Sequence, residues 1–179
     1  MKAERSDAAD SRYNQSLWKA QGREPLIFSV RPMTNRQLES LIEDAFAKVQ
    51  YPSGERLSVP TNDDEGTHEH FCGTHWRDHS AATLQRFQSA LWFFTPAAFA
   101  YFLPAYMLAV LKGGEPSQVI WGHILAQFSR SSRAAELLPA LSCDQVEALR
   151  HFMRYVCEGI PDGDGDCSGA LLNLAAGRA

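Results

Sequence analysis

The sequence predicts an all-α fold, a single irregular bundle of about five helices. In several stretches apolar residues recur three and four positions apart, as they do on the buried side of a helix. Two of these stretches open with a capping box, in which a hydroxyl residue is followed three positions later by Gln. The two pairs are Thr34 with Gln37 and Ser142 with Gln145. The chain of 179 residues is long enough for one domain with its own core.

The first helix is expected to begin at Thr34 and to pack through one face. Its charged residues fall outside the apolar stripe. Tyr51-Pro52-Ser53-Gly54 ends it, and the two prolines and two glycines of residues 51–67 predict a long loop. The stripe consists of Leu38, Leu41, Ile42, Ala45, Phe46 and Val49.

Three more helices are expected in the middle of the chain. One begins near Ser80. The next runs from Pro96 to Lys112, because Thr95 can cap it and proline is tolerated at the first helical position. A third begins near Glu115 and ends at a polar break, residues 129–133. It carries the apolar residues Val119, Ile120, Ile124 and Phe128.

The fifth helix is expected from Ser142, and the composition then changes. The sequence divides into a flexible tail at residues 1–24, a helical domain at 25–158 and a Gly/Asp-rich C-terminal tail at 159–179. Residues 91–111 carry no charge and are long enough to span a bilayer. Their prolines, tyrosines and alanines favour a buried helix instead, so no membrane association is expected.

Charge and cysteine content suggest a cytoplasmic protein. The net charge is −4, which argues against a nucleic-acid partner because phosphate binding needs clustered Lys and Arg. The first 24 residues contain no apolar run of the signal-peptide kind. Cys143 and Cys157 would lie roughly 20 Å apart on one helix, too far for a disulfide. We therefore expect the four cysteines to be reduced thiols.

Three stretches resemble a bacterial family of small proteins of unknown function. The resemblance covers about residues 34–158, and it implies a compact helical cytoplasmic protein without implying a reaction. His68, His70 and Cys72 fall outside the family pattern, so a role for them would be particular to this chain. The matching stretches are Leu38 to Pro52, Phe71-x-Gly73-x-His75-Trp76, and residues 91–107 with Leu103-Pro104-Ala105-Tyr106-Met107.

A histidine-rich segment is the candidate metal site. Four of the six histidines fall within twelve residues, and imidazole and thiolate are the usual ligands of zinc. The pattern is incomplete, because Cys72 stands where an H-E-x-x-H motif would have its second histidine. Surface histidines beside the core residues Phe71 and Trp76 are the simpler explanation of the segment, and no cofactor is otherwise expected. The candidate ligands are His68, His70, Cys72, His75 and His79.

Three functions remain open, because the chain contains no complete catalytic motif. The first is a non-catalytic protein-binding module, in its most concrete form an immunity or antitoxin protein that covers a toxin. The second is a zinc-dependent enzyme or sensor that uses the histidine segment. The third is a structural or regulatory subunit of a larger complex. Trp76, Trp92 and Tyr106 are the candidate partner-binding residues, with burial in the core as their alternative.

Overall fold

A computed structural model describes residues 33–54, 56–59, 61, 65–113, 115–159 and 167–176. These residues form nine α-helices, two short 3-10 helices and no strand, apart from an isolated bridge between Ser58 and Phe94. The all-α prediction is therefore confirmed, whereas the estimate of about five helices is wrong. The predicted N-terminal tail, residues 1–24, lies outside the described residues.

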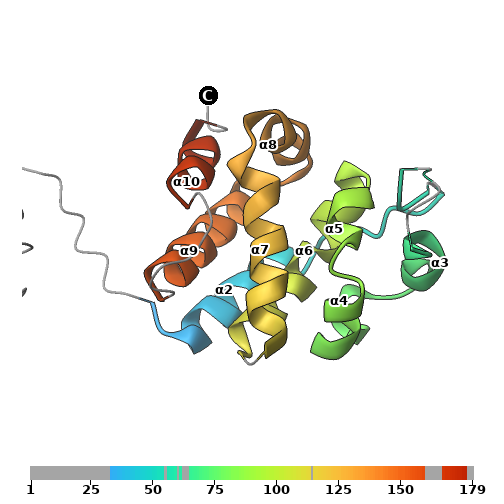
Figure 1. Cartoon of the computed structure of the whole chain (residues 1–179), viewed down its shortest axis with the longest axis horizontal. Coiled ribbons are helices and arrows are strands. Elements are labelled where there is room, and N and C mark those ends of the chain that lie inside the picture. Colours follow the sequence, from blue (N-terminus) through green and yellow to red (C-terminus); the bar gives the residue numbers. More distant parts are fainter. Residues whose placement is uncertain are drawn as a thin grey trace, which may run out of the picture. The chain divides into compact units, whose positions relative to one another are not determined.

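Four long helices form the centre of the helical domain (Figure 1). They are α2 (Asn35–Phe46), α6 (Pro96–Leu111), α7 (Glu115–Ser129) and α9 (Cys143–Gly159). α2 packs on α6 and α9, and α6 packs on α7. The capping box of Thr34 and Gln37 is present at the start of α2, as predicted.

Helix α6 is the buried centre of the bundle. Thr95 caps it by accepting a hydrogen bond from the amide of Ala98, and nearly all of its side chains are buried. It is apolar on every side because other elements cover it on every side. Within the described ranges no helix is both long and apolar enough to cross a membrane.

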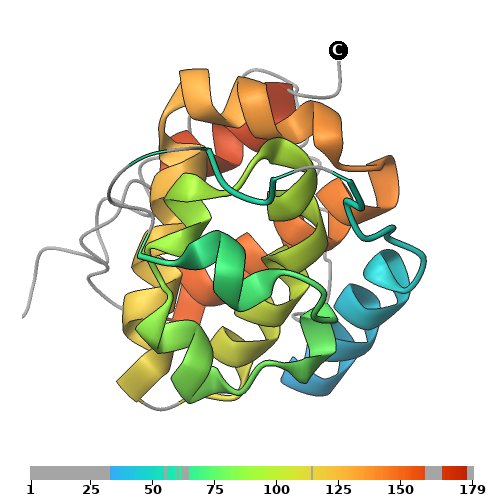
Figure 2. The same cartoon turned by 90° about the vertical axis from the view of Figure 1, so that its right-hand side faces the viewer.

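Short helices cover one side of this centre (Figure 2). They are α3 (Thr67–Phe71), the 3-10 helix η1 (Trp76–Asp78), α4 (Ala81–Arg86) and α5 (Ala90–Phe93). The single helix expected from Ser80 is therefore interrupted between α4 and α5. At this break the Tyr106 hydroxyl of α6 donates a hydrogen bond of 2.7 Å to the carbonyl oxygen of Phe87.

The segment between α2 and α3 is the predicted loop, and part of it runs beside the end of α5. The Val59 amide donates to the Phe93 carbonyl oxygen at 2.7 Å, and the Thr95 amide donates to Leu57 at 2.9 Å. The His68 ring also holds this loop, because its Nδ1 accepts a hydrogen bond of 3.1 Å from the Leu57 amide. These bonds fix the position of α5 and of the turn into α6.

The C-terminal part contains more helix than expected. A helix, α8 (Ser131–Leu137), begins within the predicted polar break, and a 3-10 helix, η2 (Leu138–Ala140), follows it. Residues 159–179 were expected to form a tail, but they include α10 (Cys167–Ala176). α10 packs on α7 and α9, with Ala170 and Leu174 buried. Its apolar residues, not the Gly/Asp-rich stretch before it, determine its structure.

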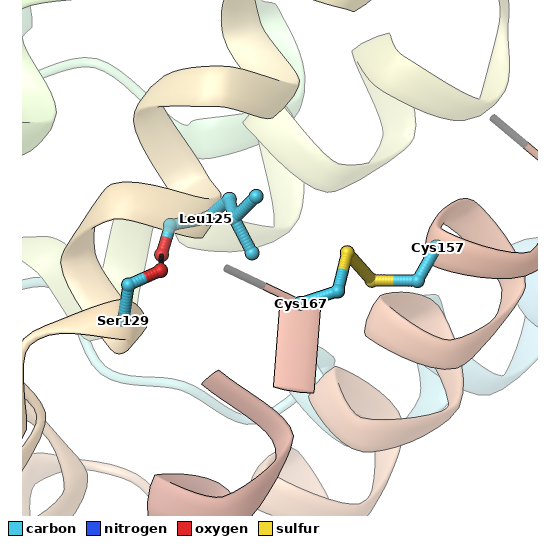
Figure 3. The surroundings of a disulfide bond; sticks show 4 residues. All are labelled: Leu125, Ser129, Cys157 and Cys167. Carbon is cyan, nitrogen blue, oxygen red and sulfur yellow. Dashed lines mark hydrogen bonds between the residues drawn. A yellow bond between two sulfur atoms is a disulfide. The ribbon is translucent and has the colours of Figure 1, made fainter. Parts of the chain in front are cut away.

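A disulfide joins Cys157 near the end of α9 to Cys167 at the start of α10 (Figure 3). Their Cα atoms are 6.2 Å apart, within the usual range for a disulfide. This bond corrects the expectation that all four cysteines are reduced. The distance argument considered Cys143 and Cys157, whereas α10 brings Cys167 to Cys157. Cys72 and Cys143 are free and exposed.

Candidate functional site

The structure does not gather the predicted metal ligands around one position. Among the described residues no three His, Cys, Asp or Glu side chains are placed to hold a metal ion. His68 holds the loop at Leu57, and Cys72 is exposed. The Nδ1 of His75 accepts a hydrogen bond of 3.1 Å from the Arg77 amide and so begins η1. The candidate ligands therefore contact different neighbours and do not surround one position.

His70 and His79 instead belong to an aromatic cluster. The His70 ring is stacked on Phe87 with centroids 4.0 Å apart, and the His79 ring lies 4.8 Å from that of Phe71. Burial lowers the pKa of both histidines, and Arg86 lowers the pKa of His70 further. Both rings therefore favour the neutral form, which packs against aromatic neighbours without the cost of burying a charge.

Two of the three candidate partner-binding residues lie in the core. Trp76 is 1% exposed and Tyr106 is fully buried. The guanidinium of Arg77 lies 4.1 Å from the centroid of the Trp76 ring and covers it. Burial raises the pKa of Tyr106 far above the usual range for tyrosine. Trp76 and Tyr106 are therefore core residues, which was the alternative to partner binding, and neither offers a surface to a partner.

Trp92 differs from them, because it is half-buried at the surface of α5. Its indole Nε1 donates a hydrogen bond of 3.0 Å to Nδ1 of His123 in the middle of α7. The guanidinium carbon of Arg130 lies 5.5 Å from its ring centroid. His123 lies on α7, whereas Arg130 follows the end of this helix and directly precedes α8. Both residues contact the Trp92 side chain. Trp92 is therefore held in place while part of it stays accessible.

The exposed side of α7 continues this surface toward the start of the helix. Val119 is 39% exposed on this helix. Gly122 is also exposed, and a Cβ atom at this position would meet no described atom within 4 Å. In Figure 1 this helix lies in front, with α5 beside it. The set Trp92, Val119, Gly122, His123 and Arg130 is called the Trp92 surface below.

The hydrogen bond from Trp92 determines the protonation of His123. An indole N–H can only donate, so Nδ1 must be unprotonated to accept. The proton of the neutral ring is then on Nε2. Burial lowers the pKa of His123, which also favours the neutral ring. The Nε2 atom is not a buried nitrogen without a hydrogen-bond partner in the described part of the chain. The Trp92 surface thus includes an N–H donor.

Arg130 and its neighbour Arg133 have different surroundings. Arg133 forms an ion pair with Glu136 at 2.7 Å, and its Nε donates a hydrogen bond of 3.1 Å to the side-chain oxygen of Gln127. No carboxylate among the described residues forms an ion pair with Arg130. The Arg130 guanidinium therefore keeps donors for a partner while it lies over Trp92.

Sequence reasoning identified Trp92 but missed His123 and Arg130. It placed Arg130 in the polar break at residues 129–133 and gave His123 no role. Helical spacing places His123 about one turn after Val119, which is the signal that could have found His123, whereas Arg130 lies beyond the end of α7 and has no such signal. The partner of this helix face, Trp92, lies 31 residues before His123, so their contact has no local signal.

One comparison with known proteins gave a match. A model of a family of unknown function (DUF6714) matches residues 34–171, which include the whole Trp92 surface and the first half of α10. No curated protein and no solved structure matches the chain. The family match extends beyond the resemblance seen in residues 34–158 and spans well over half of the sequence. The chain therefore belongs to this family of unknown function, DUF6714.

Proposed function

We propose that this protein is a protein-binding module and that its partner contacts the Trp92 surface. One observation carries the proposal: Trp92 is fixed by His123 and lies under Arg130, yet remains partly accessible. Trp and Arg are the residues most enriched among those that contribute strongly to protein interfaces. A tryptophan that is already held in one position loses little conformational freedom when a partner binds.

The residues of the Trp92 surface support a macromolecular partner. Val119 adds an exposed apolar side chain about one helical turn from His123. Gly122 directly precedes His123 on the exposed part of α7, where the absence of a side chain lets another backbone come close. An apolar centre beside polar donors is the usual composition of a protein interface.

The identity of the partner would separate the two more specific versions of this proposal. An immunity protein would bind a toxin and protect cells that produce this toxin. A subunit of a larger complex would have a permanent partner and give no protection. Production of the captured partner with and without this chain, followed by a count of viable cells, distinguishes the two.

The proposal is tested by placing an arginine on the Trp92 surface. Gly122→Arg fills open space at an exposed helical position, and arginine is a better helix former than glycine. The fold should therefore be kept while the surface is blocked. Ser40→Arg is the matched control, because Ser40 is exposed on α2, which packs on α6 and α9.

The wild type and both variants would be tagged and produced at native level in the cells that make this protein. Affinity purification with mass spectrometry should recover a stoichiometric partner with the wild type and with Ser40→Arg, but not with Gly122→Arg. Circular dichroism and thermal unfolding confirm that the variants are folded. A partner that binds Gly122→Arg as well as the wild type would show that binding uses another surface, and no partner at all would refute the proposal.

A further inference from the structure

The charges of this protein are unevenly distributed along the chain. The net charge is −4, and residues 79–136 contain four basic residues and two acidic ones, Glu115 and Glu136, of which Glu136 forms an ion pair with Arg133. The two helices that form the Trp92 surface, α5 and α7, lie within this segment. Arg130, which unlike Arg133 forms no ion pair with a described carboxylate, is therefore the cation of the Trp92 surface that can attract a negatively charged group.

Two donor groups on this surface have no acceptor among the described residues. One is the guanidinium of Arg130, whose described contact is with the Trp92 ring. The other is the Nε2–H of His123, which the bond from Trp92 leaves as the donor of the neutral ring. Because both groups flank the same indole, an acceptor that meets them would also contact an aromatic ring. A carboxylate next to an apolar side chain has this combination of properties.

We infer that the partner inserts an Asp or Glu carboxylate, with an apolar residue beside it, between Arg130, His123 and Trp92. This inference rests on the proposed function and specifies the chemistry of the partner. The carboxylate accepts from the guanidinium and from the imidazole N–H, and the apolar residue covers the exposed part of Trp92 and Val119. The net charge of −4 disfavours the other polyanion that arginine commonly binds, a nucleic acid.

The test uses random linear peptides displayed on phage and the full-length protein as bait. Peptides are selected on the wild type, and those that also bind Gly122→Arg are removed. The remaining peptides should share an Asp or Glu with an adjacent apolar residue. The shared acid is then replaced by its amide in one selected peptide, and binding is measured to the wild type and to Arg130→Gln.

For the wild type, replacing the acid by its amide should weaken binding by about tenfold or more, as expected for an important interface residue. For Arg130→Gln the same change should have an effect of less than about twofold, because the interaction is already lost. The control is Arg36→Gln, which removes an exposed arginine of α2 and should behave as the wild type.

The outcomes separate this inference from the proposed function. Two results would refute the carboxylate but not the Trp92 surface. One is a set of peptides that lose binding to Gly122→Arg but share no acid. The other is that the amide weakens binding equally in the wild type and in Arg130→Gln. If every selected peptide binds Gly122→Arg as well as the wild type, or none is selected, both the carboxylate and the proposed surface are refuted. A mixed-sequence oligonucleotide that binds the wild type and is lost with Arg130→Gln would also overturn the inference, because the acceptor would then be phosphate.

Discussion

The disulfide between α9 and α10 should make a large contribution to the stability of the oxidised protein. Cys157 and Cys167 are separated by ten residues in the sequence. A cross-link of this span reduces the conformational entropy of the unfolded chain, which corresponds to about 3 kcal/mol in the free energy of unfolding. Replacing both cysteines by serine should therefore lower that free energy by up to about 3 kcal/mol.

Other contacts should keep α10 on the bundle after the disulfide is lost. The Asn173 side chain donates a hydrogen bond of 2.8 Å to the carbonyl oxygen of Phe128, near the end of α7. Arg150 donates to the carbonyl oxygen of Leu174, and the Leu174 side chain is buried. We therefore expect a folded but less stable variant that unfolds in a single transition.

The assay is urea unfolding of air-oxidised protein, followed by circular dichroism. The matched control replaces Cys72 and Cys143, which are free and exposed, and should change the free energy of unfolding by less than about 0.5 kcal/mol. Alkylation of unfolded, unreduced wild type should modify two cysteines, and prior reduction should raise this number to four. Four modified cysteines without reduction, or equal stability of the two double variants, would refute the reasoning.

Three further predictions concern single groups. Tyr106→Phe removes a buried hydrogen bond to Phe87 and should lower the free energy of unfolding by about 1 kcal/mol, measured by urea unfolding; an unchanged value would mean that the hydroxyl contributes nothing. The pKa values of His70 and His79 are lowered in the folded protein, so the unfolded chain binds protons more readily. Stability should thus fall as the pH drops below about 6.5 and through the folded pKa values, and His70→Phe should reduce this dependence in thermal unfolding between neutral and mildly acidic pH. Protonation of His123 places two donors face to face, so acid should shift the tryptophan fluorescence of the wild type, with a smaller shift in His123→Gln.

Features that depend on neighbours in the sequence were predictable. The starts of α2, α4, α6 and α9 follow hydroxyl residues that accept hydrogen bonds from amides three positions later. Each cap and the glycine or proline near it act within a few residues, so the sequence alone indicates them. The apolar stripe of α2 is buried at Leu38, Ile42 and Phe46 for the same reason, because helical spacing is a local property.

The candidate site was only partly predictable, because exposure depends on what covers each side chain. Trp76, Trp92 and Tyr106 are all large aromatic residues, and the sequence does not show which of them other elements cover. The structure buries the first and last and leaves Trp92 partly exposed. The histidine segment similarly suggested one metal site, whereas its rings pack against Phe87 and Phe71 or hold nearby backbone amides.

The sequence by itself thus determined the all-α class and the starts of four helices, because caps, breaks and helical periodicity act over a few residues. Only the tertiary structure decided that α10 folds onto α7 and α9, that Cys167 meets Cys157, and that Trp92 bonds to His123. Each of these contacts joins separate elements, and its partners are chosen by how apolar faces pack together. Packing of this kind depends on the whole bundle and leaves no pattern in a short stretch of sequence.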